Sequence, residues 1–242
     1  MSLYYESSGN GSRNICFVHG FTQTGKSWIE AANSIANSTN TFVDAPDHGE
    51  SQGTSLTLQE SGDAIAKIAH GMVLIGYSMG ARMALHAAIQ HPRSMTGLVL
   101  VSGTPGIEDE DERTLRVDAD EALARHIESV GTSVFIEEWI RQPLFANSEF
   151  SDMEIRDRCR NTASSLSSSF FSTKSFNRTK PKNPNNRTNL SESMDPNKLY
   201  SNSNSQPYIG RPSLIAWIAC ECGSIKVGKS SDQIPYEKIP NA

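Results

Sequence analysis

Residues 72–91 read MVLIGYSMGARMALHAAIQH, and this stretch decides the fold. Its first six residues form an apolar run, which is typical of a strand buried on both faces of a parallel sheet. Its last thirteen residues have the apolar spacing of a helix. Between them lies the pattern G-x-S-x-G at 76–80. A serine on such a sharp strand-to-helix turn projects its hydroxyl above the sheet, so we expect a nucleophile elbow at Ser78. A buried serine that caps the helix is the plainer alternative.

The rest of the first 169 residues alternates in the same way. Apolar runs at 14–18, 40–44, 72–77 and 96–102 are separated by helical patterns. This alternation predicts an α/β fold with a mostly parallel sheet and helices on both faces. From residue 105 to 169 only helical patterns occur, as expected of a helical lid inserted after a strand.

The loop after the first apolar run fits two different chemistries. His19-Gly20-Phe21 is the kind of loop that supplies a second backbone NH beside an elbow serine, and we expect the NH groups of Phe21 and Met79 to form an oxyanion hole. Residues 20–27 also spell G-x-x-x-x-G-K-S, the phosphate-binding P-loop pattern. Residues 44–51, DAPDHGES, form a third motif after the next apolar run, and a P-loop enzyme has no use for it. We therefore favour the loop that binds a substrate oxygen.

Composition narrows the class of partner. The 242 residues are 37% hydrophobic and 20% charged with a net charge of -5, which gives no basic surface for nucleic acid and no polybasic membrane patch. No apolar run approaches a membrane span, and the N-terminus does not resemble a signal peptide, so we expect a cytoplasmic protein that binds a small molecule. Four scattered cysteines argue against a disulfide framework or a zinc site, and we expect no metal and no cofactor.

The three motifs HG, D-x-P-x-H-G-x-S and GYSMG, at these spacings, resemble the α/β-hydrolase superfamily over residues 14–169. The segments GYSMGAR, LVSGTPGI, ERTLRVDADEALA, EEWIRQPLF and RNTASSL are similar to the 2-succinyl-6-hydroxy-2,4-cyclohexadiene-1-carboxylate synthase family of menaquinone biosynthesis. The resemblance implies a lyase on a hydrolase fold that eliminates pyruvate. In that family the serine is thought to remove a proton alpha to a carbonyl.

Such a substrate carries several carboxylates, which a planar guanidinium can bind with two parallel hydrogen bonds. The resemblance implies that Arg82, Arg116 and Arg160 bind these carboxylates and that Tyr77 and Trp139 line the pocket. Arg82 also lies four residues after Ser78, on the same side of the expected helix. Alternatively, Arg116 pairs only with Asp120, and Trp139 is a core aromatic of the lid. The six histidines, among them His19 and His48, are expected to have structural or surface roles.

The last third of the sequence departs from the family pattern. We expect a hydrolase core at 1–104, the lid at 105–169, a low-complexity or out-of-frame and disordered segment at 170–229, and a truncated remnant at 230–242. The last strands of the fold are therefore expected to be missing or disrupted. No histidine follows His126, and neither Asp195 nor Asp232 follows an apolar strand, so no triad partner for Ser78 can be assigned.

These observations leave several functions open. A menaquinone-pathway lyase is the leading hypothesis, with this chain expected to be inactive for want of a triad Asp and His. The alternatives are a serine carboxylesterase or carbon–carbon bond hydrolase of the same fold, and a non-catalytic protein that binds a polycarboxylate. A nucleotide-binding P-loop protein ranks last.

Overall fold

The computed structural model describes residues 2–107, 109–172, 215–221 and 224–229. Seven strands of the described part form one sheet in the order β1-β3-β2-β4-β5-β6-β7. The strands are β1 Tyr5–Gly9, β2 Arg13–Val18, β3 Ser38–Val43, β4 Val73–Tyr77, β5 Gly97–Val101, β6 Ile215–Glu221 and β7 Ser224–Lys229. The helices are α1 Ile29–Asn33, α2 Leu58–Ile68, α3 Met79–Gln90, α4 Glu110–Val130, α5 Thr132–Ile140, α6 Asp152–Arg158 and α7 Ala163–Ser172, with short 3-10 helices η1 Gly25–Trp28, η2 Gly49–Ser51 and η3 Pro143–Phe145.

The four central strands β3, β2, β4 and β5 run parallel to one another, as the alternating apolar runs predict. The sequence does not reveal β1, because its residues YESSG are polar and all of them are exposed. This edge strand pairs antiparallel with β3 through the backbone ladder and through a hydrogen bond between the hydroxyl groups of Ser7 and Thr41 at 2.9 Å, and neither requires an apolar side chain. The sheet is therefore parallel at its centre and antiparallel at this edge.

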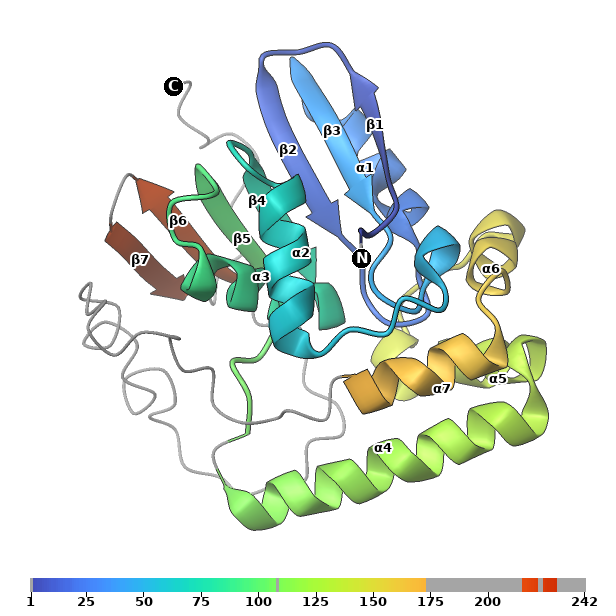
Figure 1. The fold of residues 1–242 in the computed structure, drawn as a ribbon. Helices are drawn as coiled ribbons and strands as arrows, with labels where there is room; N and C mark the ends of the chain where they lie inside the picture. Colours follow the sequence, from blue (N-terminus) through green and yellow to red (C-terminus); the bar gives the residue numbers. More distant parts are fainter. Residues whose placement is uncertain (1, 108, 173–214, 222–223, 230–242) are drawn as a thin grey trace.

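Alternating residues of the central strands face two different helical layers (Figure 1). Cys16 and Val18 of β2 pack in the larger core with α2 and α3. Ile15 and Phe17 of the same strand pack in a smaller cluster that includes Ala32 of α1. Burial on both faces explains why these strands read as continuous apolar runs.

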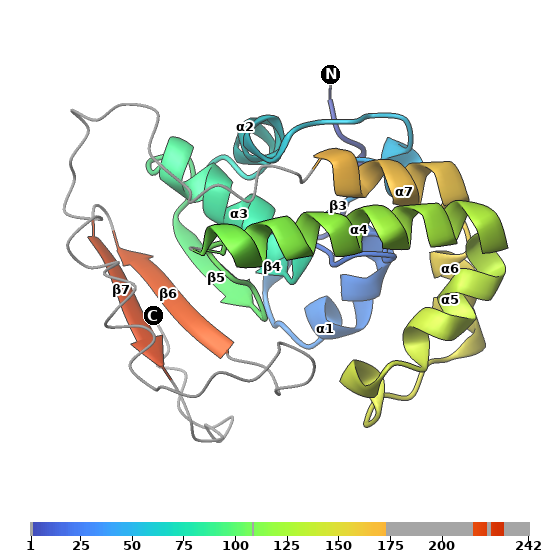
Figure 2. The same ribbon diagram turned by 90° about the horizontal axis from the view of Figure 1, so that it is seen from below.

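The lid contains four helices, α4 to α7, and lies beyond the carboxyl ends of the parallel strands (Figures 1 and 2). Its own core includes Ile127 of α4, Phe135 and Ile136 of α5, and Leu166 and Phe170 of α7. The helical pattern expected across 152–166 is interrupted after α6, and the residues between α6 and α7 turn toward the sheet. This interruption brings several polar side chains of the lid to the loops that follow β2 and β3.

The segment expected to be disordered, 170–229, is only partly described. Its described residues form the end of α7 and the strands β6 and β7, and β6 pairs antiparallel with β5. At these residues the structure differs from the expected disorder, because the apolar run IAWIACE has strand-forming residues such as isoleucine and tryptophan. Residues 173–214 and the remnant 230–242 lie outside the described residues, as do Asp195 and Asp232.

Candidate active site

Ser78 occupies the turn between β4 and α3. Its backbone has φ 52° and ψ −111°, a conformation that costs a non-glycine residue on the order of 1–3 kcal/mol. The Ser78 NH donates to the carbonyl of Val101 on the neighbouring strand at 2.8 Å, which helps to hold this conformation. Met79 is the first residue of α3, so its NH has no acceptor within the helix. This is the sharp bend that the G-x-S-x-G pattern predicts, rather than a regular helix.

The two glycines of the pattern are required by close backbone approaches. A Cβ atom on Gly76 would lie 2.5 Å from the carbonyl oxygen of Gly80. A Cβ atom on Gly80 would lie 2.4 Å from the carbonyl oxygen of Val18 and 2.5 Å from that of His19. The start of α3 therefore lies directly against the end of β2, and no side chain fits between them.

The loop that follows β2 lies beside the elbow. A Cβ atom on Gly20 would be 2.8 Å from the ring of Tyr77, the residue that precedes Ser78. Gly20 to Gln23 form a turn in which the NH of Gln23 donates to the carbonyl of Gly20 at 3.2 Å. The two segments from which an oxyanion hole was expected, 20–21 and 78–79, are thus neighbours in space.

His19 and His48 connect the loops after β2 and β3 and are fully buried. His19 accepts from the NH of Ala45 at 2.9 Å through Nε2, and its Nδ1 lies 2.8 Å from the carbonyl of Gly20. Burial lowers the pKa of His19 to about 4, and burial followed by the charge of His19 lowers the pKa of His48 to about 3. Both imidazoles are neutral near pH 7, in agreement with the structural role expected for them.

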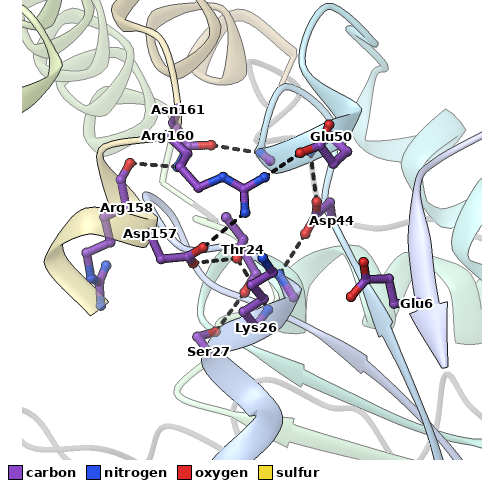
Figure 3. Close-up of polar contacts among 12 residues, drawn as sticks. Glu6, Thr24, Lys26, Ser27, Asp44, Glu50, Asp157, Arg158, Arg160 and Asn161 are labelled. Atoms are coloured by element: carbon purple, nitrogen blue, oxygen red, sulfur yellow. Dashed lines mark hydrogen bonds and ion pairs between the residues drawn. The ribbon is translucent and has the colours of Figure 1, made fainter. Parts of the chain in front are cut away.

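The carboxylate of Asp44 binds a backbone NH of residues 20–27, the segment with the P-loop pattern. Asp44 accepts from the NH of Gly25 at 2.7 Å and from the NH of Glu50 at 2.8 Å. Lys26 and Ser27 are exposed, and the Ser27 hydroxyl donates to the backbone of its own turn. Because Asp44 already takes the NH that a phosphate would need, the geometry disfavours a nucleotide in this loop (Figure 3).

Arg82 of α3 and Arg116 of α4, two of the arginines expected to bind carboxylates, lie near each other. Arg82 lies one turn after Ser78, and its NH donates to the carbonyl of Ser78 at 3.3 Å. Burial, and then the charge of Arg116, lower the pKa of Arg82 to about 10, while Asp120 raises it. Arg116 of α4 donates to Asp120 at 2.8 Å through Nε, the pairing that the i,i+4 spacing suggests. The Arg82 guanidinium remains charged at neutral pH.

The third expected arginine, Arg160, lies elsewhere. It forms ion pairs with Glu50 and with Asp157, the second at 3.5 Å, and its side chain is 41% exposed. With Lys26 and Glu50 it lines a surface hollow beside β1 whose lining does not include Ser78. Figure 3 shows its guanidinium turned toward Glu50 and Asp157.

A different arginine of the same segment, Arg158, lies beside the elbow. It is buried, and its Nη1 donates to the hydroxyl of Thr22. Its guanidinium carbon lies 5.2 Å from the centre of the Phe150 ring. Burial lowers the pKa of Arg158, and the nearby Glu154, Tyr77 and Asp157 oppose that shift. The sequence does not single out Arg158, because nothing in RDRCRN shows that Arg158, at the end of α6, is buried while Arg160 is not.

Aromatic side chains connect the turn at 20–23 to the lid. The ring of Phe21 lies 5.2 Å from that of Trp139 and 4.7 Å from that of Phe170, centre to centre. Trp139 also lies 5.6 Å from Phe135 in the lid core. Trp139 therefore both packs in the lid core and contacts the loop beside the elbow, so the two roles considered for it do not exclude each other.

No triad partner for Ser78 is found in the described part of the chain. His126, the last histidine of the sequence, is exposed on α4 and lies 2.5 Å from Glu138. His86 lies on α3, the helix that follows the elbow, but burial, and then Arg82, lower its pKa to about 4. Among the described residues there is also no cluster of three or more His, Cys, Asp or Glu side chains that could hold a metal ion.

None of the described helices is both long and apolar enough to cross a membrane.

A family model and several known proteins match the sequence of this chain. The model of the alpha/beta hydrolase family matches residues 17–197. The chain is 36% identical over 139 residues to the Arabidopsis thaliana protein PHYLLO, chloroplastic, covering 51% of this chain and 8% of PHYLLO. It is 30% identical over 139 residues to 2-succinyl-6-hydroxy-2,4-cyclohexadiene-1-carboxylate synthase of Escherichia coli O157:H7, covering 55% of each. The chain thus spans about half the length of this bacterial relative.

Solved structures show the same architecture. The structure of MenH from S. aureus has a TM-score of 0.64 and 23% identity, with 71% of each chain covered. An esterase from Exiguobacterium antarcticum has a TM-score of 0.59 and 16% identity, covering 71% of this chain and 69% of the esterase. Since the family model matches residues 17–197, which is more than half of the sequence, this chain belongs to the alpha/beta hydrolase family.

Proposed function

We propose that this protein is a lyase on an alpha/beta hydrolase fold, one that eliminates pyruvate from a polycarboxylate cyclohexene to give 2-succinyl-6-hydroxy-2,4-cyclohexadiene-1-carboxylate. The similarity to the Escherichia coli synthase supports this class of reaction. The observation that carries the proposal is that several arginine side chains lie near the elbow at Ser78. Arg82 and Arg116 lie near each other on α3 and α4, and Arg158 lies near Tyr77. An esterase for neutral esters has no use for a buried Arg158 and a half-buried Arg82 near the elbow.

The proposed chemistry assigns a role to each part of the site. Arginines bind the substrate carboxylates and orient the ring, and Tyr77 and Trp139 line the pocket. Ser78 Oγ accepts the proton alpha to a carbonyl, and the electron pair of the broken C–H bond forms a carbon–carbon double bond. The carbon–oxygen bond to the leaving group then breaks, its electron pair departs with the oxygen as the enolate of pyruvate, and the proton held by Ser78 passes to that enolate to give pyruvate. The NH groups of Phe21 and Met79 stabilise the negative charge that develops on the carbonyl oxygen.

Within this proposal we assign the third carboxylate-binding role to Arg158 instead of Arg160. Arg158 is buried next to Tyr77, whereas Arg160 is neutralised by Glu50 and Asp157 at an exposed position. Glu50 and Asp157 already offset the positive charge of Arg160, which weakens its attraction for a further carboxylate. The buried site also strengthens a charge-assisted hydrogen bond, because the local dielectric is lower there.

Ser78 needs a basic partner to act at neutral pH, and the sequence has no histidine beyond His126. We therefore propose that the 242 residues bind the polycarboxylate but do not turn it over. Binding without turnover is also what a non-catalytic binding protein would show, so the test has to restore the missing partner.

The test is a chimera in which residues 170–242 are replaced by the corresponding C-terminal segment of the Escherichia coli synthase. The chimera is expected to release pyruvate from the substrate, and its Ser78→Ala variant to release none. Hydrolysis of p-nitrophenyl butyrate without pyruvate release would favour the carboxylesterase alternative. Substrate binding with neither reaction would favour the binding protein.

A further inference from the structure

Asn161 lies in the interruption between α6 and α7, and its side chain joins three segments. Its Nδ2 donates to the carbonyl of Thr22 at 2.8 Å and to that of Arg158 at 3.1 Å. Its Oδ1 accepts from the NH of Gly49 at 2.8 Å (Figure 3). The residue is 1% exposed. A single amide of the lid thus connects the loop after β2 with the loop after β3.

The turn that Asn161 holds is strained. Thr22 has φ 68°, a left-handed conformation in which a β-branched residue is an outlier. It is the third residue of the turn Gly20–Gln23, the position where a type II turn requires positive φ and usually has glycine. Such a residue keeps this conformation only when its surroundings hold it. The surroundings here come from the lid, because Asn161 binds the carbonyl of Thr22 and Arg158 binds its hydroxyl.

The turn also carries the backbone of Phe21. If Thr22 relaxed to negative φ, the peptide between Phe21 and Thr22 would rotate, and the loop beside Ser78 would change its shape. We propose that Asn161 is a positioning residue, which holds Thr22 in the left-handed conformation and thereby fixes the backbone NH of Phe21 beside Ser78. This inference rests on the proposed function only in taking that NH as an oxyanion donor.

Gln52 provides a matched control, because it is a second amide that connects the lid to the loop after β3. Its Oε1 accepts from the NH of Thr162 at 2.9 Å, and its Nε2 donates to the carbonyls of Gly49 and Arg160 at 2.8 and 3.1 Å. None of these bonds reaches the turn at 20–23. Loss of Gln52 therefore loosens the lid without removing the support of Thr22.

The test compares Asn161→Asp with Gln52→Glu in the full chain, labelled for NMR spectroscopy. The introduced carboxylate keeps the acceptor for Gly49 but loses the donor to Thr22. The readout is the cross-peak between the amide proton and Hα of Thr22, which is strong at positive φ, together with amide exchange of residues 20–23. For Asn161→Asp we expect a weakened cross-peak and about tenfold faster exchange at 20–23, since loss of one buried hydrogen bond corresponds to about a factor of ten. For Gln52→Glu we expect the native cross-peak and native exchange at these residues.

A native cross-peak and native exchange in Asn161→Asp would overturn the proposal, as would equal effects of the two variants. If Asn161→Asp does not fold, Thr22→Gly is added, because glycine adopts positive φ without support. Recovery of folding would support the proposal, and failure to recover would overturn it. Neither readout uses a substrate, so the two proposals can fail separately. If Asn161→Asp relaxes the turn but the parent chain binds no polycarboxylate, this inference stands and the proposed function is wrong.

Discussion

The carbonyl oxygen of Val18 lies only 2.4 Å from the position that a Cβ atom on Gly80 would occupy. Because both groups are backbone atoms of buried elements, neither can move aside cheaply. Gly80→Ala is therefore expected to lower the free energy of unfolding by about 1–3 kcal/mol or more. Urea unfolding followed by circular dichroism measures the change.

Gly97 of β5 is the matched control for this substitution. A Cβ atom there would meet the methyl groups of Val73 at 3.5 Å, which is an ordinary contact. Gly97→Ala is expected to change the free energy of unfolding by less than about 1 kcal/mol. Equal costs for Gly80→Ala and Gly97→Ala would show that α3 does not pack against β2 as described.

The strained backbone of Ser78 predicts a substitution that stabilises the fold, in contrast to Gly80→Ala. Glycine adopts φ 52° without steric cost, so Ser78→Gly is expected to raise the free energy of unfolding by about 1 kcal/mol. Ser34, which has φ −79° at the end of α1, serves as the control. Ser34→Gly is expected to be neutral or destabilising. A Ser78→Gly variant that is less stable than the parent chain would argue against strain at the elbow.

The buried histidines predict a loss of stability in mild acid. The pKa values of His19 and His48 are lowered in the folded state to about 4 and about 3, below the unfolded value of 6.5. The unfolded state therefore binds more protons as the pH falls below about 6.5, and the folded state loses stability. The contribution is fully present above that pH. At pH 5 each histidine is expected to cost about 2 kcal/mol relative to pH 7.5.

Urea unfolding between pH 7.5 and 5 measures this dependence, in a range where most carboxylates stay ionised. His48→Gln is expected to reduce the loss of stability by about 2 kcal/mol. His70→Gln, at an exposed position, is expected to leave the pH dependence unchanged. A parent chain whose stability is flat over this range would contradict the buried, neutral state of His19 and His48.

The sequence predicts the centre of this fold better than its periphery. The strands at 14–18 and 72–77 and the bend at Ser78 are apparent because burial on both faces requires continuous apolar runs, and the sharp turn requires glycine at 76 and 80. The strand β1 is not apparent, since its side chains are exposed and polar, and it is held to β3 by backbone pairing and one hydroxyl hydrogen bond.

The sequence also does not predict features of the structure that depend on contacts between distant segments. The interruption between α6 and α7 is fixed by Asn161, whose partner Thr22 lies 139 positions earlier in the sequence. An asparagine in the middle of the helical pattern DMEIRDRCRNTASSL is a signal that could have indicated the break, because asparagine is a poor former of helix interiors. The choice between Arg158 and Arg160 depends on that break, which turns one of them toward Tyr77 and leaves the other with Glu50.

The proposed function requires guanidinium groups near Ser78 to bind a polycarboxylate. The most direct measurement is calorimetric titration of the 242-residue chain with 2-succinyl-6-hydroxy-2,4-cyclohexadiene-1-carboxylate, repeated for the substitutions Arg82→Gln, Arg158→Gln and, as an exposed control, Arg141→Gln. We expect saturable binding whose Kd rises about tenfold or more for each of the first two variants and stays within about twofold for the control. Absence of saturable binding, or an unchanged Kd in both Arg82→Gln and Arg158→Gln, would contradict it.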